Sequence, residues 1–325
     1  MKQTIEKFIM DELREMASAP VVLPFEILHD EIYRIALHKK FRKYAVGEDM
    51  KQKMYDTIKD KVSKGEPLDI ICLQGCFKLW RLPESPEADW AELFALMRLV
   101  SWIKPIMEIY KPGAIVEFFV DDLIMIKICN YTHDEILAYQ SSFQKIIDFV
   151  LKHAPKNLQI KITPTSTRYG GEKKFWEKLD VAVSKFAKPE EIVLSPDTIA
   201  TIEMNYRPLT DDDTKDPLWK EKNAQVHDAY MQMDDRRLYR NRPNAFLVFM
   251  FHHKGATVLQ LGSTKDSVVK PWVGVGSLRQ RDDTFMPTVL SQTQLANAKF
   301  ETHDVKIKGL DGKNFSQIRL LLSAT

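Results

Sequence analysis

The chain has 325 residues, of which 44% are hydrophobic and 28% charged, and its net charge is +2. This length allows a large core in one big α/β domain or in two smaller ones, whereas the balanced, evenly spread charge argues against nucleic-acid binding. No apolar run approaches the roughly 20 residues that span a bilayer, and three cysteines are too few for a disulfide framework, so we expect a cytoplasmic protein that does not bind membranes.

The first 66 residues are expected to form a layer of three helices without site chemistry. In the first helix the apolar residues Ile5, Phe8, Ile9, Leu13 and Met16 fall on one face. No small-residue cleavage site follows, which argues against a signal peptide. Helical patterns recur at residues 25–41 and 49–64, and the sequence at 65–67, Gly-Glu-Pro, is a typical helix stop.

Residues 67–210 are expected to form an α/β core. The apolar run at 68–75 is typical of a buried parallel strand, and a long helix at 87–110 leads to a second strand at 114–120. Residues 123–128 are interpreted as a further strand. Thr132 then caps a helix, because Glu135 three residues later completes a capping box, and a strand at 158–163 and a helix at 172–186 follow. The alternation predicts a Rossmann-like mixed sheet flanked by helices.

Residues 211–325 are expected to form a β-rich α/β part of the same domain or of a closely packed one. The acidic stretch at 211–222 is interpreted as a solvated helix lead-in rather than a metal site, since no ligand spacing accompanies it. A helix from about residue 223 carries Arg236 and Arg240 on one face. The remaining strands are expected at 245–251 with a hairpin partner at 258–261, at 273–278, at 304–308 and at 317–322.

The sequence lacks the motifs of several common chemistries. There is no glycine-rich dinucleotide or phosphate loop and no His-Glu-x-x-His zinc motif. The Gly-x-Ser-x-Gly elbow of serine hydrolases and the His-x-Asp element of iron oxygenases are also missing. Buried structural thiols best account for Cys72, Cys76 and Cys129.

Charged side chains follow several predicted strands at the ends where ligands bind in α/β sheets. The first strand leads into a loop with Lys78 and Arg81, and the second ends in Asp121 and Asp122. Such a set can hold a phosphate or carboxylate by charge-assisted hydrogen bonds and can transfer protons. Taken singly, each group is more often a surface ion pair, and that interpretation stays open. The downstream members of the set are Arg240, Arg242, His252 and Lys270.

The order of these motifs resembles the isonitrile synthase family, which includes the fungal dityrosine-pathway enzyme. The resemblance spans about residues 69–276. At two places the chain departs from the family pattern: the loop Phe-Lys-Ser-Pro-Asn is replaced by residues 77–81, Phe-Lys-Leu-Trp-Arg, and the His after Pro-Trp is replaced by Val273. The matching segments are Phe77-Lys78, Pro86-Glu87-Ala88-Asp89, the run from Ile109 to Ala114, Val120-Asp121-Asp122, the run from Thr132 to Tyr139, Arg240, Phe251-His252, Val258–Leu261 and Pro271-Trp272.

The resemblance implies an enzyme of natural-product biosynthesis that needs neither a metal nor a cofactor. It would condense the α-amine of an amino acid with the ketone of ribulose 5-phosphate to form an isonitrile, with an oxygenase of the same pathway as a downstream partner. Asp121 or Asp122 would orient the ammonium or act as base. The implied catalytic residues are Lys78, Asp121, Asp122 and His252, of which His252 would shuttle protons. The implied substrate-binding residues are Arg81, Arg240, Arg242, Lys270 and Trp272.

Two other functions stay open. The altered loop after Lys78 and the presence of Val273 favour a divergent relative that forms a different C–N bond. A non-catalytic protein that keeps the fold and binds a small anion is the second alternative. An aromatic substrate pocket of Trp80, Tyr239 and Trp272 competes with plain core packing of these rings.

Overall fold

The computed structural model describes residues 4–17, 19–38, 48–74, 86–186, 199, 202–203, 206, 210–233, 246–248, 258–259, 275–290 and 292–322. The helices are Ile5–Arg14 (α1), Phe25–Ala36 (α2), Glu48–Lys64 (α3), Trp90–Ile109 (α4), Leu123–Cys129 (α5), His133–Leu151 (α6), Thr165–Arg168 (α7), Glu172–Phe186 (α8), Asp211–Thr214 (α10), Trp219–Met231 (α11), Gln292–Asn297 (α13) and the 3-10 helix Lys313–Phe315 (η4). The strands are Leu68–Gln74 (β1), Ala114–Val120 (β2), Leu158–Pro164 (β3), Phe246–Val248 (β4), Val258–Leu259 (β5), Val275–Arg281 (β6), Thr284–Leu290 (β7), Phe300–Asp304 (β8) and Gln317–Leu321 (β9).

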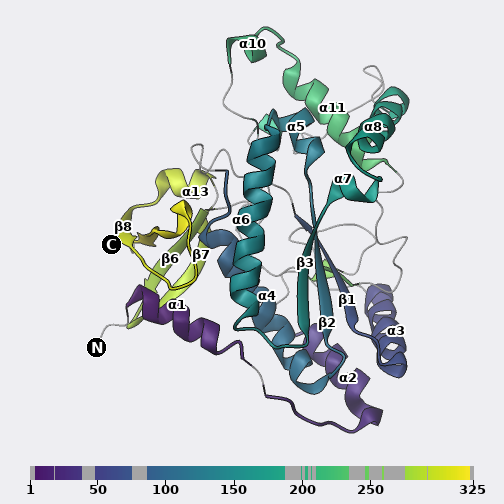
Figure 1. Ribbon diagram of the computed structural model, residues 1–325, viewed down its shortest axis with the longest axis vertical. Helices are drawn as coiled ribbons and strands as arrows, with labels where there is room; N and C mark the ends of the chain where they lie inside the picture. Colours follow the sequence, from purple (N-terminus) through teal and green to yellow (C-terminus); the bar gives the residue numbers. More distant parts are fainter. Residues whose placement is uncertain are drawn as a thin grey trace.

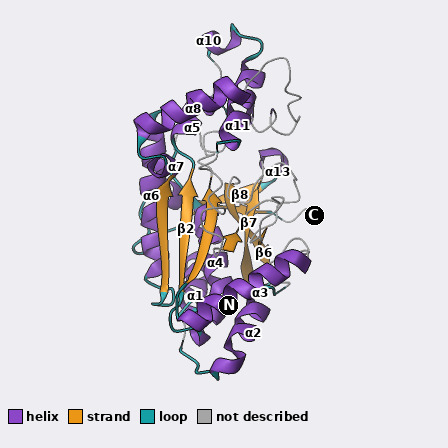
Figure 2. Ribbon diagram, turned by 90° about the vertical axis from the view of Figure 1, so that its right-hand side faces the viewer, coloured by secondary structure: helices purple, strands orange, loops and turns teal. Residues whose placement is uncertain are grey.

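The larger sheet confirms the predicted α/β class. Its strand order is β3-β2-β1-β4-β5, and each pair in it is parallel. The chain adds β2 and β3 on one side of β1 and then returns to add β4 and β5 on the other, which is the Rossmann order. Figure 2 shows β1, β2 and β3 with their carboxyl ends on one side, below α5, α7, α8 and α11. Parallel strands therefore bring the residues that follow them to a common edge.

The two faces of this sheet differ in polarity along β2. Val116, Phe118 and Val120 are buried on one face, and α6 packs there through Phe143, whose ring meets that of Phe118 edge-on at 5.3 Å between centroids. Because side chains alternate in a strand, Glu117 and Phe119 point to the opposite face. Figure 1 shows α4 and α6 together on one side of the three central strands.

Helix α4 lies between the two sheets and is buried on nearly every side. Its N-cap Asp89 forms a capping box with Glu92, and it contacts α6 of the larger sheet as well as β6 and β7 of the smaller one. The contact with β6 requires Gly276, because a Cβ there would overlap the backbone of Trp90 and Ala91. A helix that is apolar all round is expected in such a position.

The smaller sheet contains the C-terminal strands in the order β7-β6-β9-β8, with β6 and β9 parallel and the other pairs antiparallel. It is joined to α4 by the Trp90 indole, which donates a 2.7 Å hydrogen bond to the Gln317 carbonyl. It is joined to α1 by Phe8, whose ring lies edge-on to Phe285 at 5.7 Å. The predicted inward face of α1 is buried, as expected.

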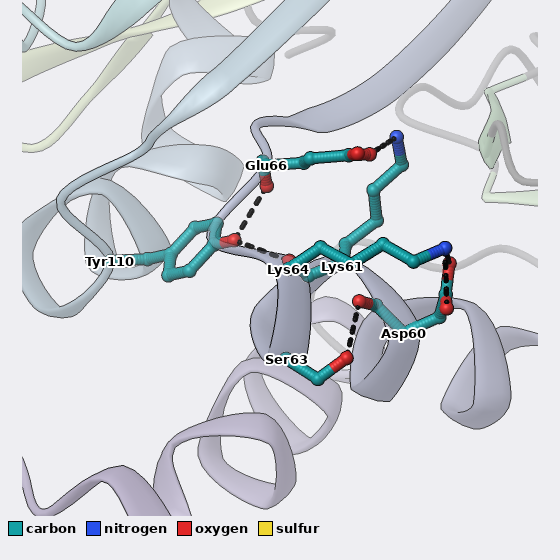
Figure 3. Close-up of polar contacts among 6 residues, drawn as sticks. All are labelled: Asp60, Lys61, Ser63, Lys64, Glu66 and Tyr110. Carbon is teal, nitrogen blue, oxygen red and sulfur yellow. Dashed lines mark hydrogen bonds and ion pairs between the residues drawn. The ribbon is translucent and has the colours of Figure 1, made fainter.

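At the amino-terminal end of the larger sheet, Tyr110 fastens α4 to α3. Its hydroxyl donates to the carbonyls of Lys61 and Glu66 at 3.1 and 2.5 Å, and Lys61 pairs with the Glu66 carboxylate at 2.7 Å (Figure 3). Burial, and then the charge of Glu66, raises the pKa of Tyr110 to about 12. Nearby, Gly65 adopts φ +64° after the last turn of α3, so the predicted helix stop is confirmed.

Several predicted elements were wrong. Residues 123–128 belong to a helix, α5, because the segment packs on α11 and ends at Asn130 in the left-handed region with φ 58°. The expected hairpin is wrong as well, since β4 and β5 are parallel. The helix expected at 25–41 ends at Ala36. The helix expected from about residue 223 is α11, Trp219–Met231, and Arg236 and Arg240, which were expected on it, lie outside the described residues. The strand expected at 304–308 is β8, which ends at Asp304.

Within the part of the chain that the structure describes, no helix is both long and apolar enough to cross a bilayer.

Candidate functional site

Asp121 and Asp122 stand directly after β2, at the carboxyl edge of the larger sheet. Helices α5, α7, α8 and α11 lie beyond this edge (Figures 1 and 2). This is where side chains from neighbouring strands meet in open α/β sheets, so the predicted carboxylate pair occupies the predicted edge. The two residues nevertheless have different surroundings.

Asp121 is half-buried and accepts hydrogen bonds from two other elements. The Tyr230 hydroxyl donates to its Oδ1 at 2.8 Å, and the Thr165 hydroxyl lies 3.4 Å from the same atom. Thr165 donates more closely, at 2.9 Å, to the carbonyl of Val120, so the start of α7 is attached to the end of β2. The carboxylate is therefore oriented by groups from α7 and α11.

Tyr230 reaches Asp121 because α11 packs on α5 and α8. The Tyr230 side chain is fully buried, and its ring lies edge-on to Phe175 of α8 at 6.1 Å between centroids. A buried phenol needs a partner for its hydroxyl, and Asp121 supplies one. The pair joins residues 109 positions apart in the sequence.

Asp122 is buried and held by Ser166 at the start of α7. Its Oδ1 accepts the Ser166 backbone N–H at 3.1 Å, and its Oδ2 accepts the Ser166 hydroxyl. Burial raises the pKa of the Asp122 carboxyl above its usual value, the hydrogen bonds from Ser166 oppose that shift, and the neighbouring Asp121 adds to it. Through these hydrogen bonds Asp122 links the end of β2 to the start of α7.

A line of polar side chains leads to this edge along the sheet face opposite α6. Glu117 on β2 is buried, accepts the Thr163 hydroxyl at 2.6 Å and pairs with Lys161 Nζ at 3.2 Å. Two residues further on, the guanidinium of Arg168 makes a cation–π contact with the ring of Phe119, with Cζ 4.4 Å from the ring centroid. Charged groups of both signs thus lie on the face that ends at Asp121.

The other predicted site residues lie outside the described part of the chain. They are Lys78, Arg81, Arg240, Arg242, His252, Lys270 and Trp272. What the structure does establish is that β1, which precedes Lys78 in sequence, pairs with β4, which precedes His252. In a sheet of this order, the boundary between these two strands is the topological switch point, where ligands bind.

Sequence reasoning missed four residues that line the edge: Thr165, Ser166, Arg168 and Tyr230. A signal for the first three was present, because they directly follow the predicted strand at 158–163, at the same edge as Asp121. Tyr230 carries no comparable signal, since its distance from Asp121 in the sequence hides the contact.

Two pockets border the smaller sheet rather than this edge. One, of about 170 Å³, lies at the start of α4, and the other, of about 400 Å³, lies beside α1 and is lined by several acidic residues. Acidic side chains at an open surface are commonly solvated. Among the described residues, no group of three or more His, Cys, Asp or Glu side chains is placed to hold a metal ion.

Comparisons with known proteins find the fold but no sequence-level relative. No protein-family model matches the chain, and no curated protein matches it. Among solved structures, the chain is similar to the crystal structure of the PvcA protein from Pseudomonas aeruginosa, at 16% sequence identity and a TM-score of 0.60. The similarity covers 90% of this chain and 99% of PvcA, so the chain has the fold of PvcA over nearly the whole of that protein.

Proposed function

We propose that this chain is an isonitrile-synthase-like enzyme that condenses the α-amine of an amino acid with ribulose 5-phosphate. The observation that carries the proposal is the likeness to PvcA, an isonitrile synthase, over 99% of its length. Fold alone does not fix chemistry. The carboxylate pair after β2, found both by the sequence motifs and at the carboxyl edge of the sheet, adds an observation at the level of residues.

In this proposal Asp121 is the base or the ammonium-binding group, and Asp122 positions it. The contrast in their surroundings supports the division, since Asp121 is half-exposed and Asp122 is buried with both oxygens engaged by Ser166. A group that exchanges protons with a substrate must lie within hydrogen-bonding reach of it. The Tyr230 hydroxyl fixes the Asp121 carboxylate in one orientation.

The remaining roles are assigned to residues that follow β1 and β4 in the sequence and to the C-terminal half. Lys78 and Arg81 would hold a phosphate or carboxylate, Arg240 and Arg242 would form a second anion clamp, and His252 would shuttle protons. Lys270 and Trp272 would complete the binding site. Support comes from the strand order, which places the ends of β1 and β4 side by side at the switch point.

The proposed reaction begins with attack of the α-amine on the ketone carbon of ribulose 5-phosphate and loss of water to form an imine. Proton transfers and eliminations then detach the rest of the sugar and leave that carbon on nitrogen as the isonitrile. A carboxylate beside the amine suits the first step, because the amine must lose a proton before it attacks.

The test is a mass-spectrometric assay of the purified chain with pooled amino acids and ribulose 5-phosphate labelled with ¹³C at the ketone carbon. The proposal expects a product heavier than one amino acid by one carbon less two hydrogens, with the label retained. Asp121→Asn should abolish this product, whereas Asp180→Asn, at an exposed position of α8, should not change its yield.

Each other outcome selects a different function. A labelled product with another mass would identify a divergent enzyme that forms a different C–N bond. Consumption of neither substrate, with a rise in melting temperature on adding ribulose 5-phosphate, would identify a protein that binds a small anion without catalysis. Absence of both turnover and stabilisation would overturn the proposal.

A further inference from the structure

We infer that the pocket at the start of α4 binds a phosphate group. This pocket borders the smaller sheet, so it is separate from the carboxyl edge at Asp121, and the inference does not depend on the proposed function. Its volume of about 170 Å³ is several times the roughly 30 Å³ that one water molecule takes in the liquid. It is smaller than the roughly 300 Å³ at which pockets for drug-sized ligands begin. The volume therefore suits a tetrahedral anion of five heavy atoms.

Two cationic side chains line this pocket, Lys313 of η4 and Arg319 of β9. Among the residues that the structure describes, neither forms an ion pair, and the Arg319 guanidinium contacts the ring of Phe300, with Cζ 5.4 Å from its centroid. A phosphate group carries about two negative charges at neutral pH, whereas a carboxylate carries one. Arg and Lys are the side chains that commonly bind phosphate. The two cations together therefore match a phosphate group better than a carboxylate.

The carboxylate that lines the pocket, that of Asp89, does not cancel this positive charge. It is buried and caps α4, where it accepts the Ala91 N–H at 2.8 Å. The partial positive charge at the N-terminus of a helix compensates such a capping carboxylate. Asp304 is not among the lining residues, and its exposed carboxylate accepts the Gln317 side-chain amide at 2.9 Å. The pocket thus keeps an excess of positive charge.

A neutral donor lies beside Arg319. Thr302 of β8 also lines the pocket, and it is the register partner of Arg319 in the antiparallel pair of β8 and β9. Directly opposite residues of such a pair have their side chains on the same face of the sheet. Phosphate oxygens accept hydrogen bonds from hydroxyl groups as well as from guanidinium and ammonium groups. The face therefore offers both kinds of donor to one anion.

The backbone segment that carries the two cations is fixed to α4 at three points. Asn314 donates through Nδ2 to the Glu87 carbonyl, just before α4, at 3.1 Å. The Trp90 indole donates to the Gln317 carbonyl at 2.7 Å. The Phe315 ring lies edge-on to that of Trp90 at 5.1 Å between centroids. The two cationic residues flank these attachments in the sequence, so their backbone is positioned before a ligand arrives, which lowers the entropy that binding costs.

The experiment is a calorimetric titration of the purified chain with inorganic phosphate, in a phosphate-free buffer whose ionic strength is kept constant with sodium chloride. The unmodified chain is expected to bind phosphate at this pocket with a stoichiometry of one. Lys313→Gln and Arg319→Gln should each weaken this binding about ten- to a hundredfold, the range for one charge-assisted hydrogen-bonded contact. Arg319→Lys keeps the charge but loses the planar fork, so it should weaken the binding less. Circular dichroism checks that each variant is folded.

Three control variants separate this pocket from general charge effects and from the proposed active site. Arg279→Gln and Lys308→Gln remove exposed cations near the same sheet and should leave phosphate affinity unchanged. Arg81→Gln removes a cation of the proposed active site and should also leave it unchanged. A second phosphate bound at the proposed active site would be lost in Arg81→Gln, while the phosphate in this pocket would remain.

The outcomes are distinct from those of the isonitrile assay. An unmodified chain that binds no phosphate would overturn the inference, as would an Arg319→Gln variant with unchanged phosphate affinity, whether or not the chain forms an isonitrile. Loss of all phosphate binding in Arg81→Gln alone would overturn it too. Titration with ribulose 5-phosphate then identifies the source of the group. Binding that Arg319→Gln weakens would show that the pocket accepts a phosphate ester, and a response to inorganic phosphate alone would show that it holds the free ion.

Discussion

Replacing Asp122 separately by Asn and by Ala tests whether the hydrogen bonds of this buried carboxyl to Ser166 stabilise the fold. Alanine leaves the Ser166 N–H and hydroxyl without their acceptor in a buried place. Each unsatisfied donor costs about 1–3 kcal/mol, and removal of a buried carboxyl returns part of that. We therefore expect Asp122→Ala to lower the free energy of unfolding by about 1–3 kcal/mol at neutral pH. Asparagine has the same shape and keeps an acceptor for the N–H, so its effect should stay within about 1 kcal/mol.

The pH dependence gives the sharper measurement. Because burial raises the pKa of Asp122 in the folded state, ionisation destabilises the fold, and this loss develops as the pH rises from below 3.8, the usual value, through the raised one. Asparagine does not ionise. The stability of Asp122→Asn relative to the unmodified chain should therefore increase over this acid range and stay constant above it.

Urea denaturation followed by circular dichroism, at a series of pH values from the acid range to neutrality, measures this difference. Asp180→Asn, an exposed change of the same kind, serves as the control and should follow the unmodified chain. A difference that shrinks as the pH rises would mean that the folded state favours the ionised carboxylate. The hydrogen bonds from Ser166 would then outweigh the burial of the Asp122 carboxylate, and the reasoning that burial raises its pKa would be refuted.

Three other changes have definite expected results. Tyr230→Phe removes the donor to Asp121, so kcat/KM in the isonitrile assay should fall about tenfold; an unchanged kcat/KM would contradict the orienting role of this hydrogen bond. Gly276→Ala should lower stability by about 1–3 kcal/mol or more in urea denaturation, because its Cβ overlaps the backbone of Trp90; equal stability would contradict the close contact. Glu92→Ala removes a buried acceptor at the start of α4 and should lower the free energy of unfolding by about 2–4 kcal/mol in the same measurement. Glu92→Gln should lower it less, and an alanine variant of unchanged stability would refute the capping role.

Much of the fold could be predicted from local signals. The strand at 114–120 and the helix at 172–186 have the predicted bounds, and the capping box of Thr132 and Glu135 forms as expected. These segments have periodicity or caps that exclude other structures. Residues 123–129 have neither, because a short apolar run fits a buried strand and a buried helix equally well. Asn130, a residue type that tolerates the left-handed region, was the available sign that a helix ends there.

The candidate site could be predicted only in part, because sequence order shows which residues follow a strand but not which helix returns to it. Asp121 was found since it follows an obvious strand. Its orienting partner Tyr230 comes from α11, and only the packing of that helix on α5 and α8 brings the two together. The direction of β5 likewise depended on tertiary structure, since parallel and antiparallel pairing leave the same apolar pattern in so short a strand.

The position of α4 has a consequence for how the molecule unfolds. Its apolar side chains complete the core beside both sheets, from Trp90 at the smaller sheet to Met107 near the far end. Neither sheet can lose its partner without exposing part of this helix to water, so the two are expected to form a single cooperative unit. In native-state hydrogen exchange, amides of β2 and of β6 should then open with the same free energy, and a chain cut before residue 275 should aggregate rather than fold.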